Sequence, residues 1–151
     1  MRYTVMLVGS SGGHLSQLWA LRPWWIEHDR VWVTFDTPDA VSLLGGERTV
    51  WAHHPTTRNV RNLVRNARLA HRVLKETRPD VVVTTGAGVA LPFFVLARLR
   101  GIRTVYVEVF DRIDSATLTG RLCRPFTSLM CVQWPEQAEL YRDAEVIGPL
   151  M

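Results

Sequence analysis

The chain has 151 residues and a net charge of +4, with 47% hydrophobic and 21% charged residues. This composition is that of a folded globular protein, and it excludes a disordered or a collagen-like chain. We expect residues 1–151 to form a single domain, because the length suffices for one core. Nearly all the cations are arginines, whose guanidinium group suits phosphate oxygens. Nucleic acid, an anionic membrane and a phosphorylated substrate are all compatible with this charge.

Short apolar runs alternate with amphipathic segments along the chain. In chain order, strands are expected at residues 2–9, 30–35, 48–52, 80–85, 103–109, 128–132 and 145–147. Helices are expected at residues 15–25, 58–77, 89–100 and 116–124, with short ones after Thr37 and Trp134. Continuous apolar strands that alternate with helices are typical of a parallel sheet covered on both faces. We therefore predict an α/β fold, a Rossmann-like doubly wound parallel sheet of about six or seven strands.

The first predicted strand ends in a glycine turn, GSSGGH, at residues 9–14. Because Gly12 and Gly13 have no side chain, a ligand can approach the backbone, and the following helix N-terminus favours an anion. Ser11 adds a hydroxyl group. His14 could hydrogen-bond a phosphate or act as a base near neutral pH. The spacing matches neither GxxxxGK[ST] nor GxGxxG, and a tight turn without a ligand is the alternative.

The fourth predicted strand ends in a similar loop, TTGAG, at residues 84–88. Two such loops at one edge of a sheet could hold both phosphates of a diphosphate, with Gly86 and Gly88 in the second loop. Glycines that only allow a helix to pack closely on the sheet are the alternative. Other unusual residues lie at or just after the ends of predicted strands, and they are Asp36, His53-His54, Glu108 and Gln133-Trp134. Because the carboxyl ends of parallel strands share one edge, we expect these residues to gather there.

A carboxylate lies within the fifth apolar run, where Glu108 belongs to YVEVFDR. A carboxylate in such a run costs several kcal/mol unless it is paired or at the mouth of a site. Glu108 could bind sugar hydroxyls or accept a proton from one, and Arg112 could bind phosphate. A structural ion pair between the two is the alternative. No metal site or cofactor is expected from the ligand spacing, and Cys123 and Cys131 are expected to be buried thiols.

A basic stripe follows the helix predicted at residues 58–77. Its cations recur at spacings of three and four, and they are Arg58, Arg61, Arg65, Arg68, Arg72 and Lys75. The other side is apolar and is expected to pack on the sheet, through Val60, Leu63, Val64, Ala67, Ala70 and Leu74. The stripe suits anionic lipid headgroups at about 1 kcal/mol per cation, and a merely solvated face is the alternative. Trp24 and Trp25 are expected either as an interfacial anchor or in the core.

The longest apolar run, at residues 89–99, is interrupted by Pro92 and Arg98 and is too short to span a bilayer. No signal peptide is visible at the N-terminus. We therefore expect a cytoplasmic protein that attaches peripherally to the cytoplasmic face of the membrane, through Arg61, Arg65, Arg68 and Arg72. Nucleic acid is not an expected partner.

Four motifs occur in an order that resembles a known family: GSSGGHLSQL, TTGAGVALPF, YVEVFDR, and CVQWPEQAELY followed by IGPL. Over essentially its whole length the chain resembles the acceptor-binding subunit of the two-subunit UDP-N-acetylglucosaminyltransferase of the dolichol pathway. Bacterial exopolysaccharide relatives of the PssD type share this arrangement. More distantly, the chain is similar to the N-terminal half of the peptidoglycan lipid-I N-acetylglucosaminyltransferase, a GT-B enzyme.

This resemblance implies one half of a split, inverting GT-B glycosyltransferase, which transfers a sugar from a UDP-sugar to a polyprenyl-diphosphate-linked saccharide. A separate donor-binding subunit would supply the UDP-sugar site in trans. By position, the resemblance implies an acceptor site made of Gly12, Gly13, His14, Gly86, Gly88, Glu108 and Arg112. His14 or Glu108 would orient or deprotonate the attacking hydroxyl. The eukaryotic subunit's N-terminal membrane helix has no counterpart here, so attachment is expected to be peripheral.

Two other functions are compatible with these residues. One is a non-catalytic scaffold that recruits a complete glycosyltransferase to the membrane, in which the basic helix matters and the glycine loops do not. The other is a stand-alone enzyme that binds a nucleotide or NAD, which the absence of GxGxxG disfavours.

Overall fold

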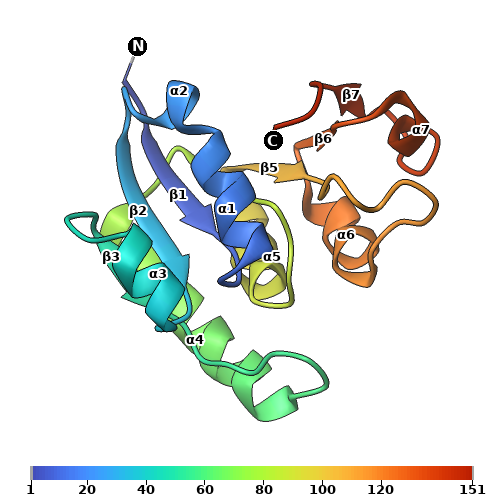
Figure 1. Ribbon diagram of the computed structural model, residues 1–151. Coiled ribbons are helices and arrows are strands. Elements are labelled where there is room, and N and C mark those ends of the chain that lie inside the picture. Colours follow the sequence, from blue (N-terminus) through green and yellow to red (C-terminus); the bar gives the residue numbers. More distant parts are fainter. Residues whose placement is uncertain (1, 151) are drawn as a thin grey trace.

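The centre of the protein is a seven-stranded parallel sheet, in a computed structural model that describes residues 2–150. The strands are β1 (Thr4–Val8), β2 (Asp29–Thr34), β3 (Thr49–Trp51), β4 (Val81–Thr84), β5 (Arg103–Val107), β6 (Leu129–Val132) and β7 (Glu145–Val146). They are arranged in the order β3-β2-β1-β4-β5-β6-β7 (Figure 1), and each neighbouring pair is parallel. The predicted α/β, Rossmann-like sheet is confirmed.

Helices cover both faces of this sheet, as a doubly wound fold requires. They are α1 (Gly13–Ala20), α2 (Arg22–Trp25), α3 (Pro38–Leu43), α4 (Val60–Thr77), α5 (Ala90–Leu99), α6 (Leu118–Cys123) and α7 (Pro135–Ala138). One buried cluster joins α1, α2 and α3 to the sheet, with Leu18, Trp25 and Trp32 among its members. The other joins α4, α5 and α6 to the sheet and includes Leu74 and Phe93. Apolar residues on both faces of the strands therefore hold the two layers of helices.

The strand order places the two glycine loops side by side. From β1 the chain winds outward through β2 to β3, then returns to β4 beside β1 and winds the other way. In open parallel sheets a ligand crevice lies at such a reversal, outside the carboxyl ends of the strands. The loops after β1 and β4 flank this point, so the topology itself favours a binding site between them.

The helix predicted at residues 15–25 is two helices, α1 and α2, which meet at Leu21. Pro23 lies in the first turn of α2, where its missing N–H is tolerated, whereas it could not continue α1. Trp25 is buried and donates its indole N–H to the carbonyl oxygen of Leu18 at 3.0 Å. Trp24 is partly exposed and precedes β2, at the amino edge of the sheet. Trp25 therefore belongs to the core, and it is not part of an interfacial anchor.

The apolar side of α4 was expected to pack on the sheet, and in its first half this prediction is wrong. Val60 is 74% exposed, Leu63 42% and Val64 47%. The side that faces the protein carries Asn62 and Asn66, both buried, ahead of the apolar residues of the second half. Figure 1 shows the first turns of α4 projecting past the carboxyl ends of the strands, so the sheet offers no apolar surface there.

The ion pair between Arg30 and Glu47 fastens the turn before β3 to β2. The Nε and Nη2 atoms of Arg30 lie 2.5 and 3.0 Å from the two carboxylate oxygens of Glu47, and the Trp32 indole donates to the same carboxylate. The Arg30 guanidinium, with the Trp32 indole, lowers the pKa of Glu47. The pair's contribution to stability should be full above about pH 4.5 and lost as the pH falls through the lower native pKa.

We expect Glu47→Gln to lower the free energy of unfolding at pH 7 by about 1–2 kcal/mol, because it removes a charge-assisted, two-point contact. The difference from wild type should shrink toward pH 3. Denaturant unfolding at both pH values measures it. The control is Asp29→Asn, which removes an exposed ion pair to Arg2 and should cost under about 0.5 kcal/mol. An equal loss in the two variants at pH 7 would contradict this account.

Candidate functional site

A polar cavity of about 500 Å³ opens at the carboxyl edge, among the loops that follow β1, β2, β3 and β4. Its hydroxyl-bearing residues are Ser10, Ser11, Thr37, Thr56, Thr57 and Thr119. The rest of its lining is His14, Phe35, His54, Pro55, Ala87 and Gly88. The volume is that of a small-molecule site. The prediction that residues scattered along the sequence gather at this edge is confirmed for the loops after β1, β2, β3 and β4.

His14 is the lining residue with the most defined chemistry. Its Nδ1 lies 3.0 Å from the carbonyl oxygen of Thr85, and the Thr85 hydroxyl donates to the backbone oxygen of His14 at 2.6 Å. Because a carbonyl oxygen only accepts, Nδ1 carries the proton and Nε2 is the basic nitrogen. Within residues 2–150 no hydrogen bond engages Nε2. Thr85, in the loop after β4, thus fixes the tautomer and the orientation of the His14 imidazole, which follows β1.

Gly86 makes room for this imidazole. Its φ of +122° disfavours any side chain, and a Cβ there would come within 3.1 Å of the His14 ring and 3.0 Å of the Tyr106 hydroxyl. Gly88 serves a similar purpose toward the loop after β3, because a Cβ would lie 3.1 Å from the Thr56 hydroxyl oxygen. Gly86 is buried beneath His14, whereas Gly88 lines the cavity. Close approach therefore explains both glycines without a phosphate.

In the glycine turn after β1, the Asp39 carboxylate already occupies the backbone N–H of Gly12, which was predicted to contact an anion. The Gly12 N–H donates to Oδ2 of Asp39 at 2.9 Å, and the Thr37 hydroxyl donates to the other oxygen at 2.6 Å. These hydrogen bonds, Thr37 first, lower the pKa of the Asp39 carboxyl. Gly12 and Gly13 are exposed at the start of α1, and Ser11 is half-buried in the cavity lining. A phosphate at Gly12 would have to displace this carboxylate.

The loop between β3 and α4 is held by two buried asparagines of α4. Asn62 donates to the carbonyl oxygen of Pro55 at 2.8 Å. Asn66 accepts from the His53 N–H at 2.9 Å and donates to its carbonyl oxygen at 3.0 Å. This explains the polar inner face of α4, which apolar periodicity could not reveal. The signal that was available is the pair of asparagines four residues apart, directly after an irregular loop.

Glu108 and Arg112, which were predicted at the acceptor, lie outside the cavity lining. Glu108 is fully buried, and its carboxylate accepts from the Val109 N–H at 3.0 Å, the Thr117 hydroxyl at 3.1 Å and the Tyr141 hydroxyl. Arg112 is exposed, and the structure does not pair it with Glu108. The Glu108 carboxylate therefore does not reach the cavity in the structure, and its role as a base stays a prediction. Its contacts show that it holds Thr117, the N-cap of α6.

Three buried glutamines organise the same edge, and no role was predicted for any of them, although Gln133 was expected at this edge. Gln133 donates to the side chain of Gln17 at 2.6 Å and to the carbonyl oxygen of Glu108 at 2.9 Å. Gln137 donates to the carbonyl oxygens of Val109 and Arg112. The QWPEQ motif thus fastens the loop after β5. Glutamines directly after the sixth apolar run were the available signal, but their partners are distant in sequence.

An apolar hollow of about 570 Å³ adjoins the polar cavity. The two share four lining residues, which are Thr56, Thr57, Gly88 and Thr119. Val60, Leu63, Leu118 and Leu122 line the hollow, and each of them is at least 42% exposed. Arg58, which precedes α4, lies at the same hollow. The polar and apolar surfaces therefore form one continuous trough at the carboxyl edge.

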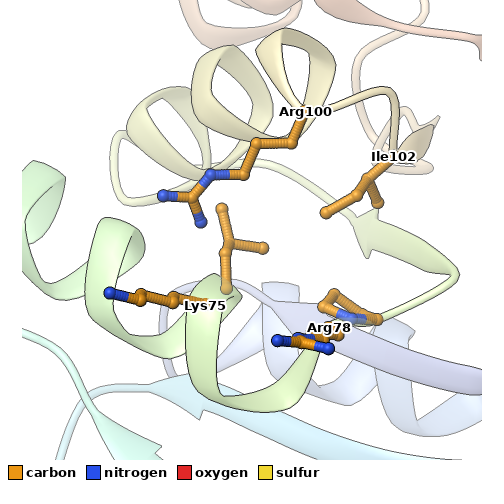
Figure 2. A pocket seen from close by; sticks show the side chains of 6 residues that line it. Lys75, Arg78, Arg100 and Ile102 are labelled. Atoms are coloured by element: carbon orange, nitrogen blue, oxygen red, sulfur yellow. The ribbon is translucent and has the colours of Figure 1, made fainter.

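A different, basic hollow lies at the opposite edge of the sheet, where α4 and α5 end. Figure 2 shows Lys75, Arg78 and Arg100 around it, with Ile102 on one wall. Arg100 donates to the carbonyl oxygen of His71 at 3.2 Å. Cations at the C-terminal ends of helices are stabilising in themselves. This hollow is remote from the glycine loops, and a structural role explains its charges.

The predicted membrane-surface arginines lie on the exposed side of α4, next to its exposed apolar residues. Arg65, Arg68 and Arg72 line a hollow with Trp51 of β3, and Arg61 is exposed one turn earlier. Arg72 also lies 4.0 Å from Glu76. In the part of the chain that the structure describes, no helix is long and apolar enough to cross a membrane.

Among residues 2–150, no group of three His, Cys, Asp or Glu residues is arranged to hold a metal ion. The two cysteines are free and buried, as predicted. Burial raises the pKa of Cys123 to about 12 and that of Cys131 to about 11, which keeps both thiols protonated at neutral pH.

The fold is that of a Rossmann-like α/β domain, which several solved structures share. MurG of Acinetobacter baumannii superposes with a TM-score of 0.78 at 19% identity, over 96% of this chain and 45% of that one. UDP-N-acetylglucosamine 2-epimerase of Rickettsia bellii gives 0.74 at 14% identity, over 98% of this chain and 45% of that one. At these identities the likeness concerns the fold alone.

The chain belongs to the family described as oligosaccharide biosynthesis protein Alg14 like, whose model matches residues 47–150. It is 39% identical to the UDP-N-acetylglucosamine transferase subunit ALG14 of Eremothecium gossypii, over 61% of this chain and 46% of that protein. It is 32% identical to the human protein of the same name, over 55% of this chain and 39% of that one. The matches span less than half the length of these relatives. The predicted family resemblance is confirmed.

Proposed function

We propose that the chain is the acceptor-binding subunit of a two-component, inverting glycosyltransferase. It acts as a single domain over residues 1–151, and it receives a sugar from a UDP-sugar onto a polyprenyl-diphosphate-linked saccharide. The names of its relatives support the class of reaction, since they are UDP-N-acetylglucosamine transferase subunits. The donor site would lie on a partner subunit that faces the carboxyl edge, because GT-B enzymes bind their substrates between two such domains.

The observation that carries this proposal is the trough in which a polar cavity meets an apolar hollow. A lipid-linked saccharide has a polyprenyl chain, a diphosphate and a sugar in that order, and the trough offers surfaces for each. The apolar hollow with Leu63, Leu118 and Leu122 suits the first isoprene units. The hydroxyl-rich cavity suits the diphosphate and the sugar, whose oxygens need hydrogen-bond partners.

His14 would act as the general base in this reaction. Its Nε2 takes the proton from the accepting hydroxyl, while that oxygen bonds to the anomeric carbon of the donor. The bond from the anomeric carbon to the phosphate breaks on the opposite side, and UDP leaves with the electron pair. The Thr85 carbonyl oxygen accepts from Nδ1–H throughout, and it stabilises the imidazolium that forms.

Reconstitution with the donor subunit tests this proposal. The chain and its partner would each be purified and mixed with UDP-N-acetylglucosamine and a short-chain polyprenyl-diphosphate saccharide. We expect sugar transfer only when both chains are present. Absence of transfer with a folded pair and several UDP-sugars would contradict the proposal. If transfer survives the replacement of His14 but is lost when the exposed residues of α4 are replaced, the chain is a recruiting scaffold.

Peripheral attachment to an anionic membrane, at its cytoplasmic face, is part of the proposal. The exposed apolar residues of α4 lie beside its arginines, and this combination is typical of helices that lie in the membrane interface. We expect the triple change of Val60, Leu63 and Val64 to serine to weaken binding to phosphatidylglycerol vesicles by about tenfold or more. Sedimentation with vesicles measures this.

The matched control for that experiment is Leu99→Ser. Leu99 is 76% exposed and ends α5 at the opposite edge, so its loss should leave vesicle binding unchanged. Changing Arg61 and Arg65 to glutamine should weaken binding by about fivefold for each cation and only for anionic vesicles. Equal binding of the triple variant and the Leu99 variant would contradict attachment through this surface.

A further inference from the structure

We infer that His54, oriented by Asp36, is a second imidazole of the acceptor cavity and binds a phosphate oxygen of the lipid diphosphate. The inference rests on the proposed function, and it adds a ligand contact that neither the glycine loops nor the family motifs supplied. His54 lies on the loop after β3, and it lines the same cavity as His14, which follows β1.

The ring of His54 is held on two sides. Its Nε2 lies 3.0 Å from Oδ1 of Asp36, and the ring packs on Phe35 with 5.0 Å between centroids. Its backbone neighbours His53 and Pro55 are fixed by the two buried asparagines of α4. Burying the two asparagine amides costs free energy unless both make hydrogen bonds, and here both do. These contacts orient the His54 ring, which is 42% exposed, toward Asp36.

The protonation of the ring follows from its partners. A carboxylate only accepts, so Nε2 of His54 carries a proton toward Asp36. Within the described residues, no hydrogen bond engages Nδ1. A phosphate oxygen also only accepts, so a phosphate at Nδ1 requires a proton there too. The ring that binds it is then an imidazolium, which makes a charge-assisted hydrogen bond.

The charges around the cavity make His54 the suitable cation. Among residues 2–150, no lysine or arginine lines the cavity, and the two histidines are the lining side chains that can become positive. His14 must keep Nε2 unprotonated to act as the base, which leaves His54 for the phosphate. The carboxylates of Asp36 and Asp39 at the rim add negative charge, so a diphosphate needs this cation all the more.

The adjacent histidine provides a matched control. His53 is exposed, and it lines a separate hollow with Trp51 and Arg65. His53→Gln and His54→Gln therefore remove the same group from neighbouring positions of one loop. Binding of farnesyl diphosphate, and separately of inorganic pyrophosphate, would be measured by calorimetry with the wild-type chain and both variants. Thermal unfolding of each variant checks that the loop remains folded.

We expect wild type and His53→Gln to bind farnesyl diphosphate equally, and His54→Gln to bind it about tenfold more weakly or worse. Pyrophosphate should show the same ratio with weaker binding, because it lacks the chain that fills the apolar hollow. Equal binding by all three proteins would overturn the inference and leave the proposed function standing. An equal loss in both variants would overturn it as well. If the wild type binds neither probe, the acceptor site itself is wrong and the inference fails with it.

Discussion

Replacing His14 by alanine is expected to lower kcat of the reconstituted two-chain transferase by about 100-fold or more, with little change in KM for the acceptor. The reason is geometric. The Thr85 carbonyl oxygen holds Nδ1–H, so Nε2 is directed to the cavity as the basic nitrogen. Removing the ring takes away the base but leaves the hydroxyls that line the cavity. Steady-state transfer rates over a range of acceptor concentrations measure both parameters.

Two further variants sharpen this prediction. His71→Ala removes an exposed histidine of α4 at the far edge of the sheet, and it should leave kcat unchanged. Gly86→Ala should behave like the His14 variant, since a methyl group there would push the imidazole out of place. Wild-type turnover in His14→Ala would remove this residue from the mechanism.

Replacing Glu108 by alanine is expected to destabilise the fold by about 3 kcal/mol, because it leaves the buried Tyr141 hydroxyl, Thr117 hydroxyl and Val109 N–H without an acceptor. Glu108→Gln keeps one acceptor oxygen and should recover most of that stability. Denaturant unfolding of the isolated chain measures both effects. Tyr141→Phe removes one donor from the same carboxylate and should cost less than Glu108→Ala.

The same variants decide whether Glu108 positions the site or takes part in the reaction. If it only holds the N-cap Thr117 of α6, Glu108→Gln should keep kcat within about threefold of wild type, since catalysis by a base would cost about 100-fold. Any loss should appear in KM, because Thr119 of the same helix lines the cavity. A folded Glu108→Gln protein with normal KM and a 100-fold lower kcat would contradict the positioning role.

The sheet and the location of the candidate site could be predicted from the sequence because both depend on local patterns. Apolar runs of strand length mark strands, and turn residues directly after them fall at one edge of a parallel sheet. His14 and the two glycine loops were found in this way. The helix ends and the break at Pro23 were harder to predict from the sequence, because the amphipathic pattern continues across Leu21.

The side of α4 that faces the protein and the environment of Glu108 could not be predicted, for one physical reason. Each depends on partners that fold back from distant positions. Asn62 and Asn66 are buried because an irregular loop needs their amides, and apolar periodicity instead selected Val60 and its neighbours. Glu108 is satisfied by Tyr141, 33 residues further along the chain. A polar residue that is buried with its partner resembles a functional one when only the sequence is known.

The most direct test of the central claim is to map where a lipid-linked acceptor touches the chain. A short-chain polyprenyl-diphosphate saccharide with a photoreactive group beside the diphosphate would be cross-linked to the protein, and the labelled residues identified by mass spectrometry. We predict labels on residues 10–14, 54–57 and 85–88, which lie in the loops around the polar cavity, and competition by unlabelled acceptor. Specific labelling confined to the basic hollow of Lys75, Arg78 and Arg100 at the opposite edge would contradict the assignment of this cavity as the acceptor site.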